Sequence, residues 1–209
     1  MYCAGAAGPS GIEARVATIM PPLIGNQQII IVRGREILTL RDMLPPTPCL
    51  RVLLVGKAPA PSSVELGHYF QGTMGKTFWS ILKRRKLLKS TNGFEDDSLV
   101  AQGYGMTDVV KVPHPFNDEP SDDEYREGAA HVLELLRTYR PRVVVFVYKK
   151  ALDMMARLQF GMERKSTYGF NDSLEAHFGA RVFAFPLPGV PCRSAEAKIA
   201  LDELVNACK

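Results

Sequence analysis

The segment L-R-V-L-L-V-G, residues 50–56, is the clearest indication of the fold. It is a short apolar run that ends in glycine, which is typical of a buried strand in a parallel sheet. Similar apolar runs lie at 106–112, 143–147 and 181–186, and helical stretches separate them. Strands that alternate with helices predict an α/β fold. We expect three α/β/α layers around a central, mostly parallel four-stranded sheet.

The predicted helices follow these strands. The spacing of apolar residues predicts a helix over 77–88. Ser121 opens a second helix, to about Tyr139, with the capping-box pattern S-D-D-E. A third helix is expected to run to about Leu158, and a last one to cover 194–208.

The chain divides into an N-terminal extension, 1–49, and a main domain, 50–209. Residues 1–25 are rich in small residues and are expected to form a flexible lead-in. Two apolar runs, 27–32 and 36–40, flank a glycine and predict a small hairpin.

Composition narrows the class of protein. The 209 residues carry a net charge of +4, which is compatible with a polyanionic partner. No two of the four cysteines form a C-x-x-C pair, which favours reduced thiols in a cytoplasmic protein, nucleoid-associated if bacterial. No apolar run approaches the length of a membrane span, and the first residues lack a signal-peptide pattern. We therefore expect no membrane partner.

The segment G-T-M-G-K-T (72–77) contains the G-K-T of a phosphate-binding loop. The Walker pattern requires glycine five positions before Gly75, where this chain has Phe70. The preceding residues do not read as a buried strand either. A nucleotide-binding loop is therefore not expected, and Phe70 and its neighbours need another explanation.

In a parallel sheet the site lies at the carboxyl ends of the strands. Three loops should meet there: G-K-A-P-A-P-S-S after the first strand, the segment around Asp108, and P-L-P-G-V-P-C-R after the last strand. The order of motifs resembles the uracil-DNA glycosylase superfamily from about residue 50 onward, above all its mismatch-specific branch. The similar segments are G-K-A-P-A (56–60), G-H-Y-F (67–70), Phe78-Trp79, Y-G-M-T-D-V-V (104–110) and P-L-P-G-V-P-C-R (186–193).

The resemblance implies a monofunctional DNA glycosylase. Such an enzyme hydrolyses the N-glycosidic bond of a flipped-out uracil, or another damaged base, and leaves an abasic site. Its partner would be DNA that contains uracil or an abasic site. It implies no metal or organic cofactor, and a monomer.

The resemblance also implies a base-binding pocket. Its expected members are Gly56, Lys57, Ala58, Pro59, His68, Phe70 and Leu187. Phe70 would stack on the flipped base, although core packing alone would also explain an aromatic residue there. The segment 72–77 would be a loop beside this pocket, and Trp79 a core residue.

Several positions depart from the family pattern. Better-known branches place Asn or Asp at position 58 to hold the attacking water, and His or Asn at position 187 to donate a hydrogen bond to the base. This chain has Ala58 and Leu187. Branches that share the alanine usually carry an iron–sulfur cluster, with a cysteine where this chain has Val112, so no cluster is expected.

Asp108 becomes the candidate catalytic residue. Uracil-selective relatives have Asn at this position, which can both donate and accept hydrogen bonds, whereas an ionised Asp only accepts. Asp108 could instead activate water and stabilise a cationic sugar. A turn or capping role beside the strand is the simpler alternative.

The last motif resembles the family's intercalation loop, so DNA contacts are expected from Pro188, Gly189, Val190 and Arg193. Val190 would be the wedge and Arg193 a phosphate contact. His114 lies in a Pro-rich loop expected to border the DNA.

Two alternatives stay open. Because Ala58 and Leu187 replace two usual catalytic positions, the chain could be a catalytically silent binder of flipped-base or abasic DNA. It could also be a small-molecule enzyme on a similar sheet, although the chain has no clean G-x-G-x-x-G.

Overall fold

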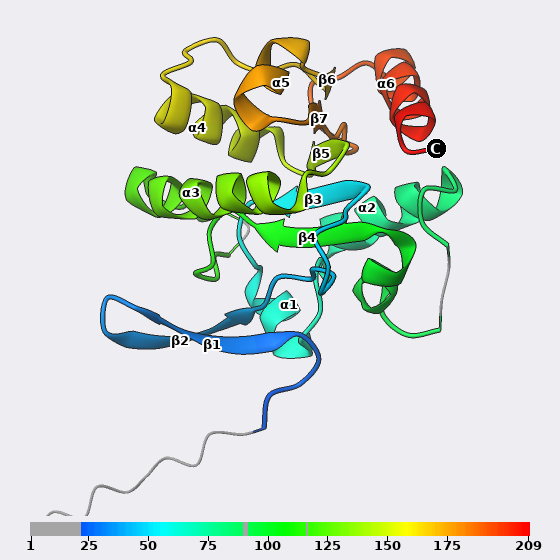
Figure 1. Cartoon of the computed structure of the whole chain (residues 1–209). Helices are drawn as coiled ribbons and strands as arrows, with labels where there is room; N and C mark the ends of the chain where they lie inside the picture. The colour runs from blue at the N-terminus through cyan, green and yellow to red at the C-terminus, as the bar shows by residue number, and fades with distance from the viewer. Residues whose placement is uncertain (1–21, 90–91, 116) are drawn as a thin grey trace, which may run out of the picture.

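The computed structural model describes residues 22–89, 92–115 and 117–209 (Figure 1). A five-stranded sheet with the order β4-β3-β5-β7-β6 forms its centre. The strands are β3 (Val52–Gly56), β4 (Tyr104–Asp108), β5 (Val143–Phe146), β6 (Gly169–Phe170) and β7 (Arg181–Ala184). The first four strands in that order pair in parallel, and β6 pairs antiparallel with β7. Most of the predicted lead-in, 1–25, lies outside the described residues.

Helices cover both faces of this sheet. The α-helices are α1 (Pro61–Leu66), α2 (Thr73–Arg84), α3 (Asp122–Tyr139), α4 (Lys149–Phe160), α5 (Asp172–Phe178) and α6 (Ser194–Ala207). Two short 3₁₀ helices, η1 (Glu95–Ser98) and η2 (Val100–Gln102), precede β4. The side chains of α1, α2 and α6 pack on one face, and those of α3, α4 and α5 pack on the other. Figure 1 shows α2 and α6 on one side of the sheet and α3 and α4 on the other.

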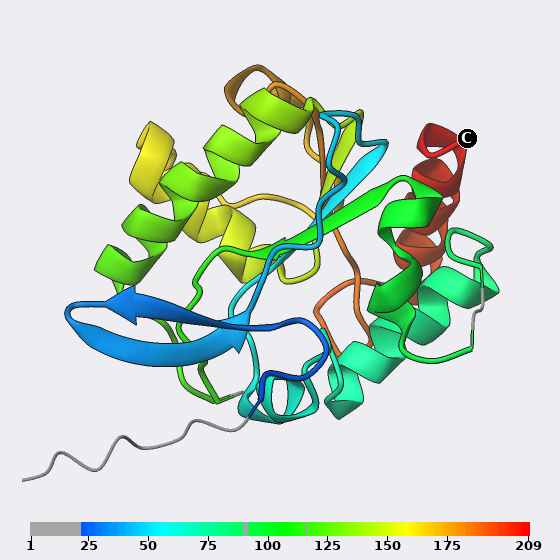
Figure 2. The same cartoon turned by 60° about the horizontal axis from the view of Figure 1, so that its bottom comes forward.

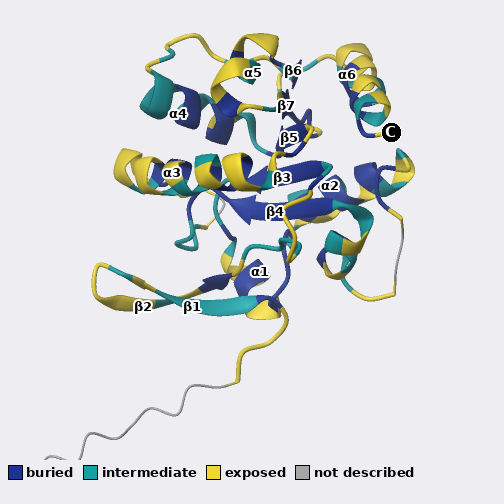
Figure 3. Cartoon of the chain, viewed as in Figure 1, coloured by how far each residue is buried: buried dark blue, intermediate teal, exposed yellow. Residues whose placement is uncertain are grey.

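The sequence of β3 explains why the sheet is buried on both sides. Successive side chains of a strand point to opposite faces. Val52 and Leu54 join the core under α2 and α6, whereas Leu53 and Val55 join the core under α3 and α4. A strand with both faces buried therefore needs an uninterrupted apolar run. Figure 3 shows β3 and the neighbouring strand β4 as buried.

The N-terminal hairpin lies outside these layers. It consists of β1 (Gln27–Val32) and β2 (Arg35–Leu40), paired antiparallel. Its turn residues, Arg33 and Gly34, have φ angles of 51° and 74°, as a two-residue hairpin turn requires. The Thr39 hydroxyl donates a hydrogen bond of 2.5 Å to the carbonyl of Lys111. This bond ties the base of the hairpin to the segment after β4, while its turn reaches away from the sheet (Figure 2).

The predicted fold class is confirmed: the chain has three layers, a mostly parallel sheet and an N-terminal hairpin. The capping box at Ser121 is also confirmed, because its hydroxyl accepts a hydrogen bond from the backbone of Glu124 and its own N–H donates to the Glu124 side chain. Among the described residues, no helix combines the length and apolar character needed to cross a membrane.

Three details differ from the prediction. The two-residue strand β6 adds a fifth, antiparallel member to the four parallel strands. The strand predicted over 106–112 begins earlier and ends at Asp108, which places this residue at the sheet edge. The helix predicted over 77–88 spans Thr73–Arg84, so G-T-M-G-K-T (72–77) is the start of a helix and not a loop.

Candidate active site

The connections of the sheet create a crevice at its carboxyl edge. The chain leaves β3 toward α1 and α2 on one face, and it leaves β5 toward α4 on the opposite face. Ligands of open α/β sheets bind at such a switch point, outside the carboxyl ends of the strands. A cavity of about 550 Å³ lies here. Its walls come from the loop after β3 with the start of α1, the Phe70 loop, the start of α2, Asp108 and Tyr148.

Asp108 forms the polar end of this cavity. It is the last residue of β4, and its side chain is buried, with 1% exposure. Neither carboxyl oxygen has a hydrogen-bond partner among the described residues. Burial raises the pKa of Asp108 to about 7, against the opposing charge of Lys111 and with a further increase from Asp42. An unpartnered buried carboxyl at the wall of a cavity is the expected signature of a functional group.

Gly56 brings Asp108 and Phe70 together. It pairs with Asp108 across β3 and β4. A Cβ atom on Gly56 would lie 1.9 Å from Asp108 Oδ1 and 3.1 Å from Phe70 Cζ. Any side chain at position 56 would therefore occupy the space that the carboxyl group and the phenyl ring now share.

Phe70 has a strained backbone. Its φ angle is 57°, a region that residues other than glycine rarely adopt. Three contacts hold the surrounding loop. Trp79 Nε1 donates to the carbonyl of Tyr69 at 3.1 Å, the Tyr69 amide donates to Asp96 at 2.8 Å, and the Gln71 amide donates to the Ser63 hydroxyl at 3.0 Å. The fold thus maintains an unfavourable conformation that places the phenyl ring in the cavity wall.

The packing of α2 explains the G-K-T sequence. A Cβ atom on Gly75 would lie 2.2 Å from the carbonyl oxygen of Phe70. Glycine is therefore required because the first turn of α2 contacts the strained loop directly. No phosphate-binding role is needed to account for it.

Among the other predicted pocket residues, Ala58 and Pro59 line the cavity. Lys57 does not, because its ammonium group binds the Asp118 carbonyl at 3.1 Å and Glu119 Oε2 at 3.3 Å. Lys57 thus holds the loop that follows β4.

His68 and Leu187 also lie away from the cavity, which differs from the prediction. His68 Nδ1 lies 3.0 Å from Asp96 Oδ1, and its ring stacks on Phe94 with centroids 3.6 Å apart. Leu187 is buried and lines a separate hollow between α2 and α6. Leu187 is therefore not among the residues that line the cavity with Asp108.

His114 is held by two carboxylates. Its Nδ1 lies 3.0 Å from Asp118 Oδ2, and its Nε2 lies 3.1 Å from Glu124 Oε1. These contacts connect the Pro-rich loop to the start of α3. They give His114 a structural role and occupy both ring nitrogens.

The loop after β7 is open to solvent. Pro188 and Gly189 are exposed, and Val190 is half-buried. The side chain of Arg193 is 88% exposed, and its nearest carboxylate, Glu196, is 3.9 Å away. The structure therefore presents these predicted DNA contacts at the carboxyl edge of the sheet, outside the cavity.

Two features escaped the sequence analysis. Tyr148, which lies one residue beyond Val147 after the end of β5, lines the cavity. Its place after a buried strand could have indicated this.

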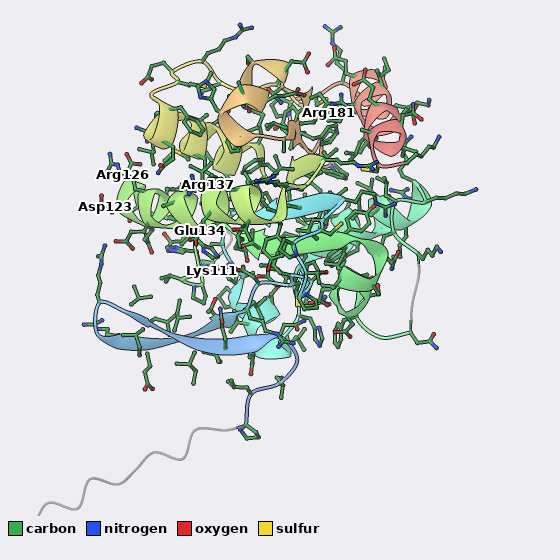
Figure 4. All side chains as sticks on the ribbon, in the orientation of Figure 1. Lys111, Asp123, Arg126, Glu134, Arg137 and Arg181 are labelled. Carbon is green, nitrogen blue, oxygen red and sulfur yellow. The ribbon has the colours of Figure 1, made fainter. Side chains whose placement is uncertain are left out.

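The second feature is a network in which Asp42 binds Lys111, and His131 Nε2 lies 2.7 Å from Asp42 Oδ2. Figure 4 shows Lys111 on the hairpin side of the sheet. Burial would raise the pKa of Asp42, but hydrogen bonds and the charge of Lys111 lower it to about 2.

One group of described residues has donors close enough for a metal ion: His68, Asp96 and Asp97. The Asp96 carboxylate already accepts hydrogen bonds from the Tyr69 amide and from Asn26 Nδ2. These contacts fix the loop before Phe70, so hydrogen bonding accounts for the cluster without a metal.

Comparison with known proteins agrees with this fold. The family model described as "Uracil DNA glycosylase superfamily" matches residues 45–190. The chain therefore belongs to the uracil-DNA glycosylase superfamily. It is also similar to a G/U mismatch-specific uracil DNA glycosylase of Schizosaccharomyces pombe, with 29% identity over 135 residues. That alignment covers 63% of this chain and 41% of the relative, so the chain spans less than half of that protein's length.

Proposed function

We propose that the chain is a monofunctional uracil-DNA glycosylase. It would hydrolyse the N-glycosidic bond of a uracil turned out of the DNA and leave an abasic site. The observation that carries this proposal is the buried, unpartnered Asp108 carboxyl beside Phe70 in a cavity of about 550 Å³. Family membership and the similarity to a named uracil-DNA glycosylase support the same reaction.

The proposed reaction assigns separate roles to the two residues. The flipped base stacks on the Phe70 ring, which contributes about 1–3 kcal/mol without selecting a base. The bond between sugar C1′ and base nitrogen then breaks, and the base takes the electron pair. Ionised Asp108 stabilises the cationic sugar and accepts the proton of the attacking water. The water oxygen bonds to C1′, and the released base takes up a proton.

The cavity wall supports hydrolysis rather than lyase chemistry. In the described part of the chain, no lysine lines the cavity, and Lys57 of the G-K-A-P-A motif is bound to Glu119. A Schiff base with the sugar would require such an amine. On the outer surface, we assign the opening of the duplex to Val190 and a phosphate contact to Arg193.

A catalytically silent binder is the second candidate. Ala58 lies in the cavity wall and has no polar side-chain atom, while Leu187 lies outside the cavity. Both positions carry catalytic groups in the better-known branches. Such a binder would retain flipped-base or abasic DNA without releasing a base.

Single-turnover base release decides between the two. The protein is mixed in excess with single-stranded and G·U-containing oligonucleotides, and alkali converts abasic sites to strand breaks. Breaks that depend on uracil, and that fall at least about tenfold with Asp108→Asn, support the glycosylase. Retention of abasic DNA on a gel without any uracil-dependent breaks would support the binder.

A further inference from the structure

The cavity contains a hydroxyl group that the proposed reaction has not yet used. Tyr148 follows β5 and is the residue immediately before α4. Its backbone continues the sheet, because Val147 donates a hydrogen bond of 2.9 Å to the carbonyl of Val55 on β3. The carbonyl of Tyr148 accepts a hydrogen bond of 3.0 Å from the backbone N–H of Ala151, which fixes Tyr148 at the first turn of α4. The ring is therefore positioned by the sheet and by the helix together.

Tyr148 and Asp108 lie on opposite sides of Gly56. Asp108 ends β4, Gly56 ends the neighbouring β3, and Tyr148 follows β5 on the far side of β3. Adjacent strands are about 4.8 Å apart, so the backbones of these two residues are separated by roughly 10 Å. Because Gly56 has no side chain, the Asp108 carboxyl and the Phe70 ring can both approach the end of β3 at this point. Asp108 and Tyr148 both line the cavity of about 550 Å³.

Phe70 forms the wall that joins these two groups. The Tyr148 ring meets the Phe70 ring edge-on, with centroids 6.3 Å apart and an interplanar angle of 69°. A base stacked on Phe70 would therefore lie in the same cavity as the Tyr148 ring. The charge of Asp108 also acts on the phenol, which places the two groups in one electrostatic environment.

Other cavity hydroxyls are engaged or exposed. Tyr69 donates to the carbonyl of Arg41 at 3.1 Å, and Ser63 accepts from the Gln71 amide at 3.0 Å. Ser62 and Thr73 are exposed at the rim. Among the described residues, no protein group hydrogen-bonds the Tyr148 hydroxyl.

We propose that the Tyr148 hydroxyl is the hydrogen-bond donor to the oxygen of the departing base. This inference rests on the proposed glycosylase reaction, and it supplies the group that Leu187 cannot provide. As the C1′–N bond breaks, negative charge develops on the base oxygen, and the phenol O–H stabilises it without transferring its proton. Burial, together with the Asp108 charge, raises the pKa of Tyr148 to about 12, so the donor keeps its proton at neutral pH.

The test compares leaving groups in the Tyr148→Phe variant. Single-turnover release is measured at pH 8 from oligonucleotides that contain uracil or 5-fluorouracil at the same position. Fluorine withdraws electrons and stabilises the departing base, so a donor matters less. Tyr148→Phe is expected to slow uracil release about a hundredfold, and 5-fluorouracil release about tenfold or less. Tyr139→Phe, at the end of α3 and away from the cavity, is the matched control and should leave both rates unchanged.

Two results would overturn the assignment. The first is a Tyr148→Phe protein that releases uracil at the wild-type rate. The second is one that is slowed equally on both bases, which would indicate lost packing rather than a lost donor. Thermal unfolding of the variant confirms that it is folded.

A binding measurement keeps the two proposals separable. It uses an oligonucleotide with 2′-fluoroarabino-uridine, whose glycosidic bond resists cleavage, and an abasic counterpart. If the wild-type protein releases no base, the glycosylase proposal fails. Tyr148 remains the base donor only if Tyr148→Phe lowers the preference for the uridine oligonucleotide at least about fivefold. An unchanged preference would overturn the donor role as well.

Discussion

The two ends of the sheet's carboxyl edge differ in the burial and hydrogen bonding of their residues. At the β3–β4 end, Asp108 is buried without a partner and Phe70 has a strained backbone. At the β7 end, Pro188 and Gly189 are exposed, and the side chain of Arg193 is 88% exposed. Buried, unsatisfied groups cost stability and are retained where chemistry needs them. Exposed, weakly held groups suit a surface that meets a partner. We therefore expect chemistry at the first end and DNA contact at the second.

Alanine substitutions at two glycines, one at each end, test this difference most directly. Gly56→Ala places a methyl group 1.9 Å from Asp108 Oδ1, whereas a Cβ on Gly189 meets nothing within 4 Å. Gly56→Ala should lower single-turnover release at least about a thousandfold, or about 4 kcal/mol of barrier. It should also cost about 1–3 kcal/mol of unfolding free energy through overpacking. Gly189→Ala introduces only the strain of a positive φ, so it should lower the unfolding free energy by about 1 kcal/mol. Equal effects on release would contradict the division of roles.

The stability of an Asp108→Asn variant tests the buried carboxyl. In the folded protein, Asp108 keeps its proton up to a pH near its pKa of about 7. In the unfolded chain, Asp108 loses this proton near its ordinary pKa of 3.8. As pH rises through this window, the wild-type protein loses the stability that the bound proton provides, and the Asn variant does not. The unfolding free energy of the variant relative to wild type should therefore increase by about 4 kcal/mol between pH 4 and pH 8. Urea titrations at both pH values measure it, and a pH-independent difference would contradict the raised pKa.

Phe70→Ala tests stacking. The preference for DNA with an uncleavable uridine over abasic DNA should fall by about 1–3 kcal/mol, because only the former has a base to stack. Val190→Ala, at the other end, is the matched variant, and it should weaken both complexes alike. If Phe70→Ala also changes the two affinities equally, the ring serves packing alone.

The smallest effect is expected from Arg193→Ala. Loss of one phosphate contact should weaken binding to all sequences by less than about 1 kcal/mol and reduce the salt dependence of binding by about one ion. Release from bound DNA should stay unchanged. Affinities measured across a salt series would contradict the contact if the slope is the same in both proteins.

Local pattern was sufficient for most of the fold. The apolar run at 50–56 predicted a strand buried on both faces, and S-D-D-E predicted the start of α3. The boundaries of β4 and α2 depended on more than pattern. The sheet ends at Asp108 because β3 ends opposite it at Gly56, and α2 begins early because Gly75 packs against Phe70.

The sequence predicted less of the site than of the fold. Asp108 and Phe70 followed from the motif order, but the direction of a side chain within a motif did not. His68 is two residues from Phe70, yet its Nδ1 lies 3.0 Å from Asp96 Oδ1 and the residue does not line the cavity. Tyr148 has no motif, because its place depends on three strands meeting at one edge. The contacts of Asp42 with Lys111 and His131 join segments far apart in the chain.

The pH dependence of single-turnover uracil release tests the central claim most directly. Only the ionised Asp108 carboxylate can accept the proton of the attacking water. Release by the wild-type protein should rise about tenfold per pH unit below a midpoint near the pKa of about 7 and level off above it. Release by Asp108→Asn should be low and flat over the same range. A wild-type profile that is flat from pH 5.5 to 8.5, or an Asn variant that releases uracil at the wild-type rate, would contradict the assignment of Asp108 as the catalytic base.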